Sequence, residues 1–233
     1  MAHPQFADDC KDFNLRSYKP ARKPLLNARN IRDRLTFCRT FQNWTESYWS
    51  NVLFTDECCL CQFNPTVQRI CRPPNQRYDM KYVQPTVKHS LSLMVWGGIS
   101  SQGRAPGATV NSDRYIDILH EKLHTWFTVR NCNILMYDGA LCHQSKKVKK
   151  WLQDNVHVLS PWPGLSPDLN PIENCWSLVK QKVSLRNPIS LNDLRREIIH
   201  VGTTEITQEY CENMIRSTVC QDGSRLFWQL MDK

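Results

Sequence analysis

The chain has 233 residues, 41% of them hydrophobic, which supplies enough apolar surface for a folded core and excludes a wholly disordered protein. Lys and Arg outnumber Asp and Glu by 30 to 22, and the resulting net charge of +8 favours a polyanionic partner such as nucleic acid. The first residues, MAHPQFADDCKDF, lack the pattern of a signal peptide, and no apolar run is long enough to span a bilayer. We therefore expect an intracellular protein with no membrane partner.

Eleven cysteines without a secretory signal indicate reduced thiols, many of them buried, rather than a disulfide framework. The segment CCLC contains the C-x-x-C spacing found in many zinc sites. Its β-prone neighbours predict a strand, however, and in a strand Cys58 and Cys61 point to opposite faces. A zinc site is therefore not favoured here.

The N-terminal part begins with a polar segment, residues 1–24, which ends in KPARKP and is predicted to be an extended tail or linker. A helix is predicted from Asn27 onwards, because apolar residues recur at helical spacing at Ile31, Leu35 and Cys38. Thr45 suits the N-cap of a second, short helix. The opposite face of the first helix is expected in solvent and carries Arg29, Arg32 and Arg34.

The pattern then changes to short β-prone runs, which predict an antiparallel meander at 51–57, 58–63 and 67–72. A further strand at 91–100 is predicted to end at Gly97 and Gly98. Helices and strands alternate after that: a helix at 113–127, a strand at 133–140 that stops at Asp138, a helix at 145–155, a strand at 156–163, and helices near 191–204 and 207–219. This order predicts one α/β domain with a mixed sheet flanked by helices.

Two predicted strands carry an acidic residue behind an apolar run, Asp56 after NVLFT and Asp138 after NILMY. Aspartate is a common turn residue, but strand ends in α/β proteins also hold ligands. Glu173, behind the proline-rich SPWPGLSPDLNP, has two interpretations as well. It either completes a capping box with Asn170 as N-cap and Pro171 at the first helical position, or it joins the two aspartates.

Three converging carboxylates would repel one another, by about 4 kcal/mol for a pair ~4 Å apart at an effective dielectric constant of 20. Divalent cations such as Mg²⁺ offset this repulsion, and a pair of them can activate a nucleophile and stabilise the leaving oxygen at a phosphodiester. The prolines before Glu173 would then fix its helix against the strands. Glu57 should point to the other face of the strand from Asp56 and is not expected to be a ligand.

Several segments resemble the catalytic domain of Tc/mariner-family transposases, a branch of the DDE/D polynucleotidyl transferases with a ribonuclease-H-like fold. These segments are KPLLNARNIRDRLTFCRTF, VLFTDE, PTVKHSLSLMVWGGIS, MYDGALCH and, most specifically, WPGLSPDLNPIENCWSLVKQKV. The 34 residues between Asp138 and Glu173, and glutamate as the third acid, are typical of the Tc branch. The resemblance implies an α/β, ribonuclease-H-like catalytic domain over 25–190, with 191–233 as its C-terminal helical extension.

The resemblance also implies the chemistry. Asp56, Asp138 and Glu173 would form the catalytic, metal-binding triad and hold two Mg²⁺ or Mn²⁺ ions. The activity would be metal-dependent DNA strand cleavage and strand transfer at the ends of a transposable element, with transposon ends and target DNA as partners, in a nuclear protein that forms a homodimer. His143 corresponds to a histidine that follows the second acid in the family, and is either a structural loop residue or a group near the scissile phosphate.

The chain departs from the family pattern in two places. Gly139, Ala140 and Leu141 follow the second acid, where the family usually has Asn and often a later Pro, and the N-terminal helix-turn-helix modules of the relatives are not in this sequence. Two alternatives therefore stay open: a catalytically silent or domesticated DNA-binding derivative, and a same-fold nuclease without strand transfer. Four lysines near the second acid either follow phosphates or form a solvated helix face: Lys146, Lys147, Lys149 and Lys150.

Overall fold

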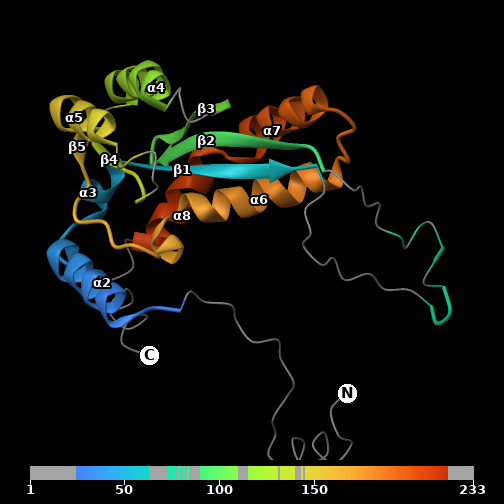
Figure 1. Ribbon diagram of the computed structural model, residues 1–233, viewed down its shortest axis with the longest axis horizontal. Coiled ribbons are helices and arrows are strands. Elements are labelled where there is room, and N and C mark those ends of the chain that lie inside the picture. The colour runs from blue at the N-terminus through green and yellow to red at the C-terminus, as the bar shows by residue number, and fades with distance from the viewer. Residues whose placement is uncertain are drawn as a thin grey trace, which may run out of the picture.

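The computed structural model describes residues 25–62, 73–76, 78–79, 81, 83, 90–109, 115–130, 132–139, 143 and 145–219. Within these ranges the chain forms a five-stranded mixed sheet with the strand order β3-β2-β1-β4-β5 (Figure 1). The strands are β1 (Val52–Cys61), β2 (Ser92–Ser100), β3 (Gly103–Thr109), β4 (Ile134–Met136) and β5 (His157–Val158). Strands β1, β2 and β3 are antiparallel, whereas β1, β4 and β5 are parallel. The predicted mixed sheet is confirmed.

Strand β1 corrects the first part of the predicted meander. The runs at 51–57 and 58–63 belong to one ten-residue strand, so Asp56 lies inside a strand and not at its end. Its alternation continues through CCLC, where Cys58 is buried and Cys61 is half-buried on the other face. The predicted strand at 67–72 and the tail at 1–24 lie outside the described residues.

Strand β2 runs past Gly97 and Gly98 to Ser100, and a tight turn leads into β3, which the sequence analysis missed. The β3 sequence GRAPGAT is rich in Gly, Pro and Ala, residues with low β propensity. It occupies an edge of the sheet, which is where a strand tolerates proline because one row of N–H groups needs no partner.

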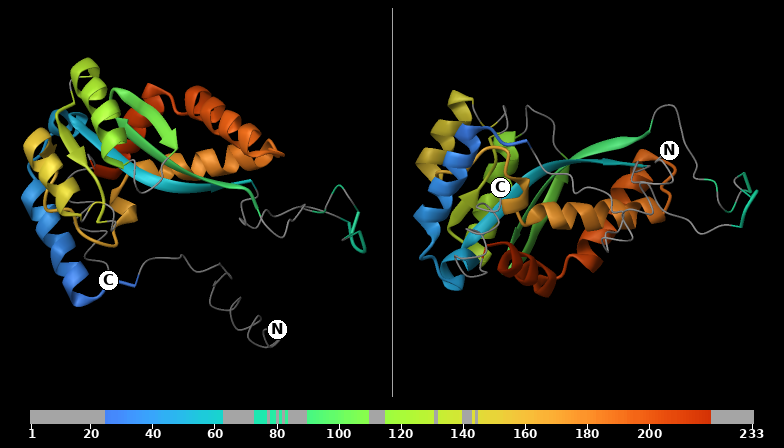
Figure 2. Two further views of the ribbon diagram at one scale, coloured as in Figure 1. Left: turned by 45° about the horizontal axis from the view of Figure 1, so that its top comes forward. Right: turned by 90° about the horizontal axis from the view of Figure 1, so that it is seen from below.

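Helices cover both faces of the sheet (Figures 1 and 2). Helices α6 (Ile172–Leu185), α7 (Leu191–Glu205) and α8 (Gln208–Val219) pack against β1, β2 and β3, while α4 (Tyr115–Arg130) and α5 (Lys146–Asn155) contact the sheet at β3 and β5. Alternate residues of the central strands divide between two apolar cores: Phe54 and Met136 face the α6 side, whereas Leu53 and Leu135 join α4 and α5. None of the described helices is long and apolar enough to cross a membrane. The domain boundary at residue 190 stays a prediction.

Helix α2 (Ala28–Phe41) and the short α3 (Glu46–Ser50) form the N-terminal part of the described chain. The prediction that the arginine face of α2 is solvated is wrong for Arg34, which is only 3% exposed and lies in a buried stripe with Phe37, Cys38 and Phe41. Its guanidinium makes two hydrogen bonds to the Asp168 carboxylate, of 2.8 and 2.6 Å, and one of 2.8 Å to Ser166 Oγ. Charge pairing across the fold therefore overrides the local helix pattern.

Candidate active site

The parallel pairing of β1 with β4 brings Asp56 and Asp138 to the same edge. Phe54 lies opposite Met136, and each aspartate follows two residues later on its own strand or the chain that leaves it. The register is fixed further by Thr55, whose Oγ1 donates a 2.8 Å hydrogen bond to the Met136 carbonyl. Strand β4 ends at Met136, so Asp138 lies just beyond the end of β4, beside Asp56 on the neighbouring strand.

The proline-rich loop carries Glu173 to the same place. After the short 3₁₀ helix η4 (Pro167–Leu169), the buried Asn170 side chain reaches the Thr55 carbonyl at 3.5 Å, next to Asp56. Helix α6 begins at Ile172, so Glu173 is its second residue rather than its third. Asn170 Oδ1 accepts a 3.4 Å hydrogen bond from the Ile172 N–H, but among the described contacts the Glu173 carboxylate does not return one to the Asn170 N–H. The capping-box interpretation of Glu173 is therefore not what the structure contains.

The Arg34–Asp168 pair holds the other end of this loop. Asp168 lies within η4, and Arg34 joins it to helix α2 over 134 residues of sequence. Ser166, just before η4, is buried and also accepts a hydrogen bond from Arg34. The segment that leads to Glu173 is thus fixed at Asp168 against α2 and at Asn170 against β1.

One turn after Glu173, Trp176 contacts the first acid directly. Its indole Nε1 donates a 3.0 Å hydrogen bond to Asp56 Oδ2. Gly97 pairs with Asp56 across the β1–β2 ladder, and a Cβ atom at Gly97 would lie 2.7 Å from the Trp176 ring. Glycine is therefore required there to let the indole approach β2.

The electrostatics show that the three acids share one environment. Burial, followed by the charges of Glu173, Glu57 and Asp138, raises the pKa of Asp56 to about 7. Burial also raises the pKa of Glu173, opposed by Lys180 and reinforced by Asp138. Asp56, Asp138 and Glu173 therefore lie within reach of one another's charge, with Lys180 as a cation beside Asp56 and Glu173.

A second group of ionisable side chains, His143 and Glu57, lies next to Asp138. His143 is 1% exposed, and its Nδ1 lies 3.0 Å from Asp138 Oδ1 and 3.1 Å from the Asp138 carbonyl oxygen. Its Nε2 lies 3.4 Å from Glu57 Oε1, a distance that makes an ion pair rather than a well-formed hydrogen bond. Burial lowers the pKa of His143, but the two acids outweigh it and raise that pKa to about 10. The imidazole is therefore a cation between two anions.

Two sets of side chains have donor atoms suited to a metal ion. In the described part of the chain, Glu57, Asp138 and His143 place ligand atoms within 4.8 Å of one another. A protonated imidazole has no lone pair to offer, so this set is already neutralised internally. Asp56, Asp138 and Glu173 do not form such a close group in the described part of the chain, and Lys180 offsets part of the charge of Asp56 and Glu173. Their carboxylate oxygens are the type of ligand that a hard divalent cation takes.

Several residues of this site were not anticipated. Trp176 and Lys180 lie three and seven positions after Glu173, a helical spacing that could have indicated them. Lys180 lies against Cys58 and interacts with both Glu173 and Asp56. Glu57 does point away from Asp56, as expected, yet it reaches the site through His143.

Gly139 is exposed, Leu141 lies outside the described residues, and the four lysines of α5 are exposed: Lys146, Lys147, Lys149 and Lys150.

The chain matches known proteins over most of its length. Residues 51–195 match the family model described as DDE superfamily endonuclease. The sequence is 34% identical over 181 residues to the Tcb2 transposase of Caenorhabditis briggsae, covering 74% of this chain and 66% of the relative. It is 32% identical over 179 residues to the Tc1 transposase of Caenorhabditis elegans, covering 72% and 65%. The match thus spans slightly less than two thirds of these relatives.

Solved structures with the same fold are transposases of the Mos1 mariner element. The Mos1 paired-end complex with Mn superposes with a TM-score of 0.80 at 16% identity, covering 98% of this chain and 70% of that one. The Mos1 catalytic domain alone superposes with a TM-score of 0.66 at 16% identity, covering 91% of this chain and 97% of that one. The expected ribonuclease-H-like fold is confirmed.

Proposed function

Because this chain belongs to the Tc/mariner branch of the DDE superfamily of endonucleases, we propose that it is a catalytic domain for metal-dependent DNA cleavage and strand transfer at the ends of a transposable element. The observation that carries the proposal is the convergence of Asp56, Asp138 and Glu173 on one edge of the sheet. Asp56 lies on β1, Asp138 follows the parallel strand β4, and Glu173 lies on a helix whose leading loop is fixed by Asn170.

These three residues would be the metal ligands, for two Mg²⁺ or Mn²⁺ ions. Bound there, divalent ions would lower the pKa of an attacking water or 3′-hydroxyl and stabilise the leaving oxygen of the phosphodiester. The raised pKa values of Asp56 and Glu173, caused first by burial and then by neighbouring carboxylates, support this assignment, because a bound cation would stabilise the charged form of both groups.

The chain's own residues orient the three acids. Trp176 donates a hydrogen bond to Asp56 Oδ2. His143, itself paired with Glu57, holds Asp138 Oδ1. Arg34 and Asn170 fix the loop that leads to Glu173. These contacts would limit the conformational freedom that the carboxylates lose when they bind the metal ions.

The proposed partners are the DNA of the transposon ends and of the target, with a second copy of the chain completing the assembly in the nucleus. The net charge of +8 and the exposed lysines of α5, beside the chain that carries Asp138 and His143, support the DNA partner. Binding through such charges should weaken steeply with salt concentration.

A cleavage assay tests the function. Supercoiled plasmid and a labelled DNA end are incubated with Mn²⁺ and the protein, its Asp138→Asn variant, or a matched control, Asp154→Asn, which changes an exposed aspartate on α5. We expect metal-dependent nicking by the parent and the control, loss in Asp138→Asn, and joining of the labelled 3′-end to plasmid. Nicking without joining would indicate a nuclease, and no nicking by the parent would indicate a silent derivative.

A further inference from the structure

A cavity of about 360 Å³ lies between strand β2 and helices α6 and α7, on the sheet face that carries Asp56. Its walls are apolar and include Leu93, Val95, Ile172, Val179 and Ile198. This volume falls in the range of small-molecule sites, about 300 to 1,000 Å³. The proposed DNA chemistry gives it no role.

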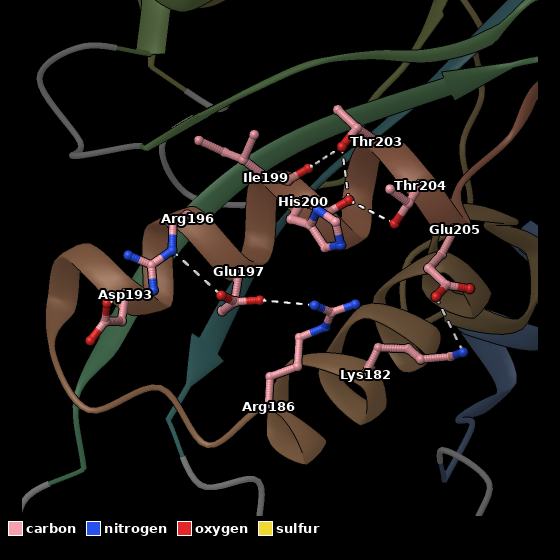
Figure 3. Close-up of polar contacts among 10 residues, drawn as sticks. All are labelled: Lys182, Arg186, Asp193, Arg196, Glu197, Ile199, His200, Thr203, Thr204 and Glu205. Carbon is pink, nitrogen blue, oxygen red and sulfur yellow. Dashed lines mark hydrogen bonds and ion pairs between the residues drawn. The ribbon is translucent and has the colours of Figure 1, made fainter.

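Helices α6 and α7, which flank the cavity, are joined by two ion pairs. Lys182 pairs with Glu205 at 3.3 Å and Arg186 pairs with Glu197 at 3.2 Å, so ion pairs connect the two helices along one side (Figure 3). Ile199, which lines the cavity, points away from that ion-paired side (Figure 3). These two ion pairs therefore join the helices outside the cavity, next to the apolar core that they share.

Gly202 shows that the space next to α7 is unfilled. It lies inside the helix and lines the cavity, and a Cβ atom built on it would meet no atom of the described structure within 4 Å. Glycine in a helix interior costs about 1 kcal/mol relative to alanine. A larger side chain at position 202 would fit sterically and would stabilise the helix, but the chain has glycine there and the space is not filled.

The charges around the cavity have one sign. Arg104 and Arg195 line it, and no acidic side chain among the described residues does. Neither arginine forms an ion pair with a described residue, whereas the neighbouring Arg196 pairs with Asp193 and Glu197. An apolar cavity with two unpaired guanidinium groups is complementary to a ligand with an apolar body and an anionic head.

We propose that this cavity is a binding site for a small apolar carboxylic acid, with its hydrocarbon part between β2, α6 and α7 and its carboxylate on Arg104 and Arg195. The cavity wall includes Trp176, whose Nε1 donates to Asp56. A ligand there therefore contacts the residue that orients the first acid. Occupancy would be transmitted to the DNA-cleaving site through the position of this one indole.

The test follows the indole N–H resonances of the ¹⁵N-tryptophan-labelled protein during titration with octanoate, with octylammonium as the cationic probe of equal length. The Trp176 resonance is assigned from its loss in Trp176→Phe. Arg195→Gln removes a cavity charge, and Arg196→Gln is its matched control outside the cavity. Gly202→Leu fills the cavity, and Gly202→Ala reports the helix effect with little filling.

We expect octanoate to shift the Trp176 resonance saturably, with about tenfold weaker affinity in Arg195→Gln, unchanged affinity in Arg196→Gln, and no saturable shift in Gly202→Leu. Three results overturn the proposal: no Trp176 shift in the parent, an equal shift with octylammonium, or undiminished octanoate binding in a folded Gly202→Leu. If Gly202→Leu does not fold, the comparison of Arg195→Gln with Arg196→Gln decides. The readout is binding, so it does not depend on DNA cleavage.

Discussion

Trp176 Nε1 donates a 3.0 Å hydrogen bond to Asp56 Oδ2 and thereby joins helix α6 to strand β1. Glu173 lies one turn earlier on the same helix, so this contact sets the spacing between two of the three acids. It also couples the proposed cleavage site to the cavity behind the indole.

Replacing Trp176 by Phe removes the donor and keeps most of the apolar packing. We expect a loss of about 1 to 3 kcal/mol in the free energy of unfolding and a larger relative loss of DNA nicking, because Asp56 loses its orientation. Urea denaturation and the plasmid assay measure the two effects. Trp151→Phe on α5 is the control, and a nicking loss no greater in Trp176→Phe than in this control would contradict the orienting role.

Two glycine substitutions should have opposite effects on stability. Gly97→Ala places a Cβ atom 2.7 Å from the Trp176 ring and should destabilise the protein by about 1 to 3 kcal/mol. Gly202→Ala places its Cβ in open space on a helix and should stabilise by up to about 1 kcal/mol. The urea midpoints of the two variants and the parent provide the comparison. A Gly97→Ala variant more stable than the parent would show that close packing of the Trp176 indole does not require glycine at position 97.

Arg34 should matter far more than its neighbour Arg32. Arg34→Met leaves Asp168 and Ser166 without their donor, and we expect a loss of about 2 to 4 kcal/mol, moderated because Asp168 is half-exposed. Arg32→Met, on the exposed side of the same helix, should change stability by less than about 0.5 kcal/mol. Equal effects in denaturant titrations would mean that the buried pair does not hold the loop.

The metal-free protein should lose stability as pH rises. The pKa of Asp56 is about 7 in the folded state and about 3.9 unfolded, so the folded state binds more protons between these values and stability falls as pH rises from about 4 to 7. His143, with a folded pKa of about 10, contributes stability that is complete below about 6.5 and lost as pH rises through 10. Melting temperatures of the parent and Asp56→Asn across pH 4 to 8 test the first window. The Asp56→Asn curve should be flatter, and parallel curves would disprove the shift.

The elements that local patterns determine could be predicted, whereas long-range pairing could not. The alternating helices and strands after residue 113, and the acids Asp56 and Asp138 behind apolar runs, follow from hydrophobic periodicity and propensity. The burial of Arg34 depends on Asp168, 134 residues away, and no local pattern reports that contact. Strand β3 was missed because its edge position, and not its propensity, makes GRAPGAT a strand.

The site shows the same division. Glu173 was found from its proline-rich motif, but its helix starts one residue later than predicted because Pro171 becomes the N-cap. Glu57 was not predicted as a site residue, because strand alternation places it on the other face from Asp56. The strand pattern does not reveal that the His143 imidazole connects Glu57 to Asp138. The role of the three acids as metal ligands stays a proposal that experiment must decide.

The most direct test of that proposal is the melting temperature as a function of Mn²⁺ concentration, for the parent and for Asp56→Asn, Asp138→Asn, Glu173→Gln and the control Asp154→Asn. Binding to the folded state alone raises stability by about 2.7 kcal/mol at one hundred times Kd. The account predicts a rising melting temperature in the parent and the control, and a much smaller rise in the other three. Equal Mn²⁺-induced shifts in the parent and in Asp56→Asn or Glu173→Gln would show that these acids do not form the metal site.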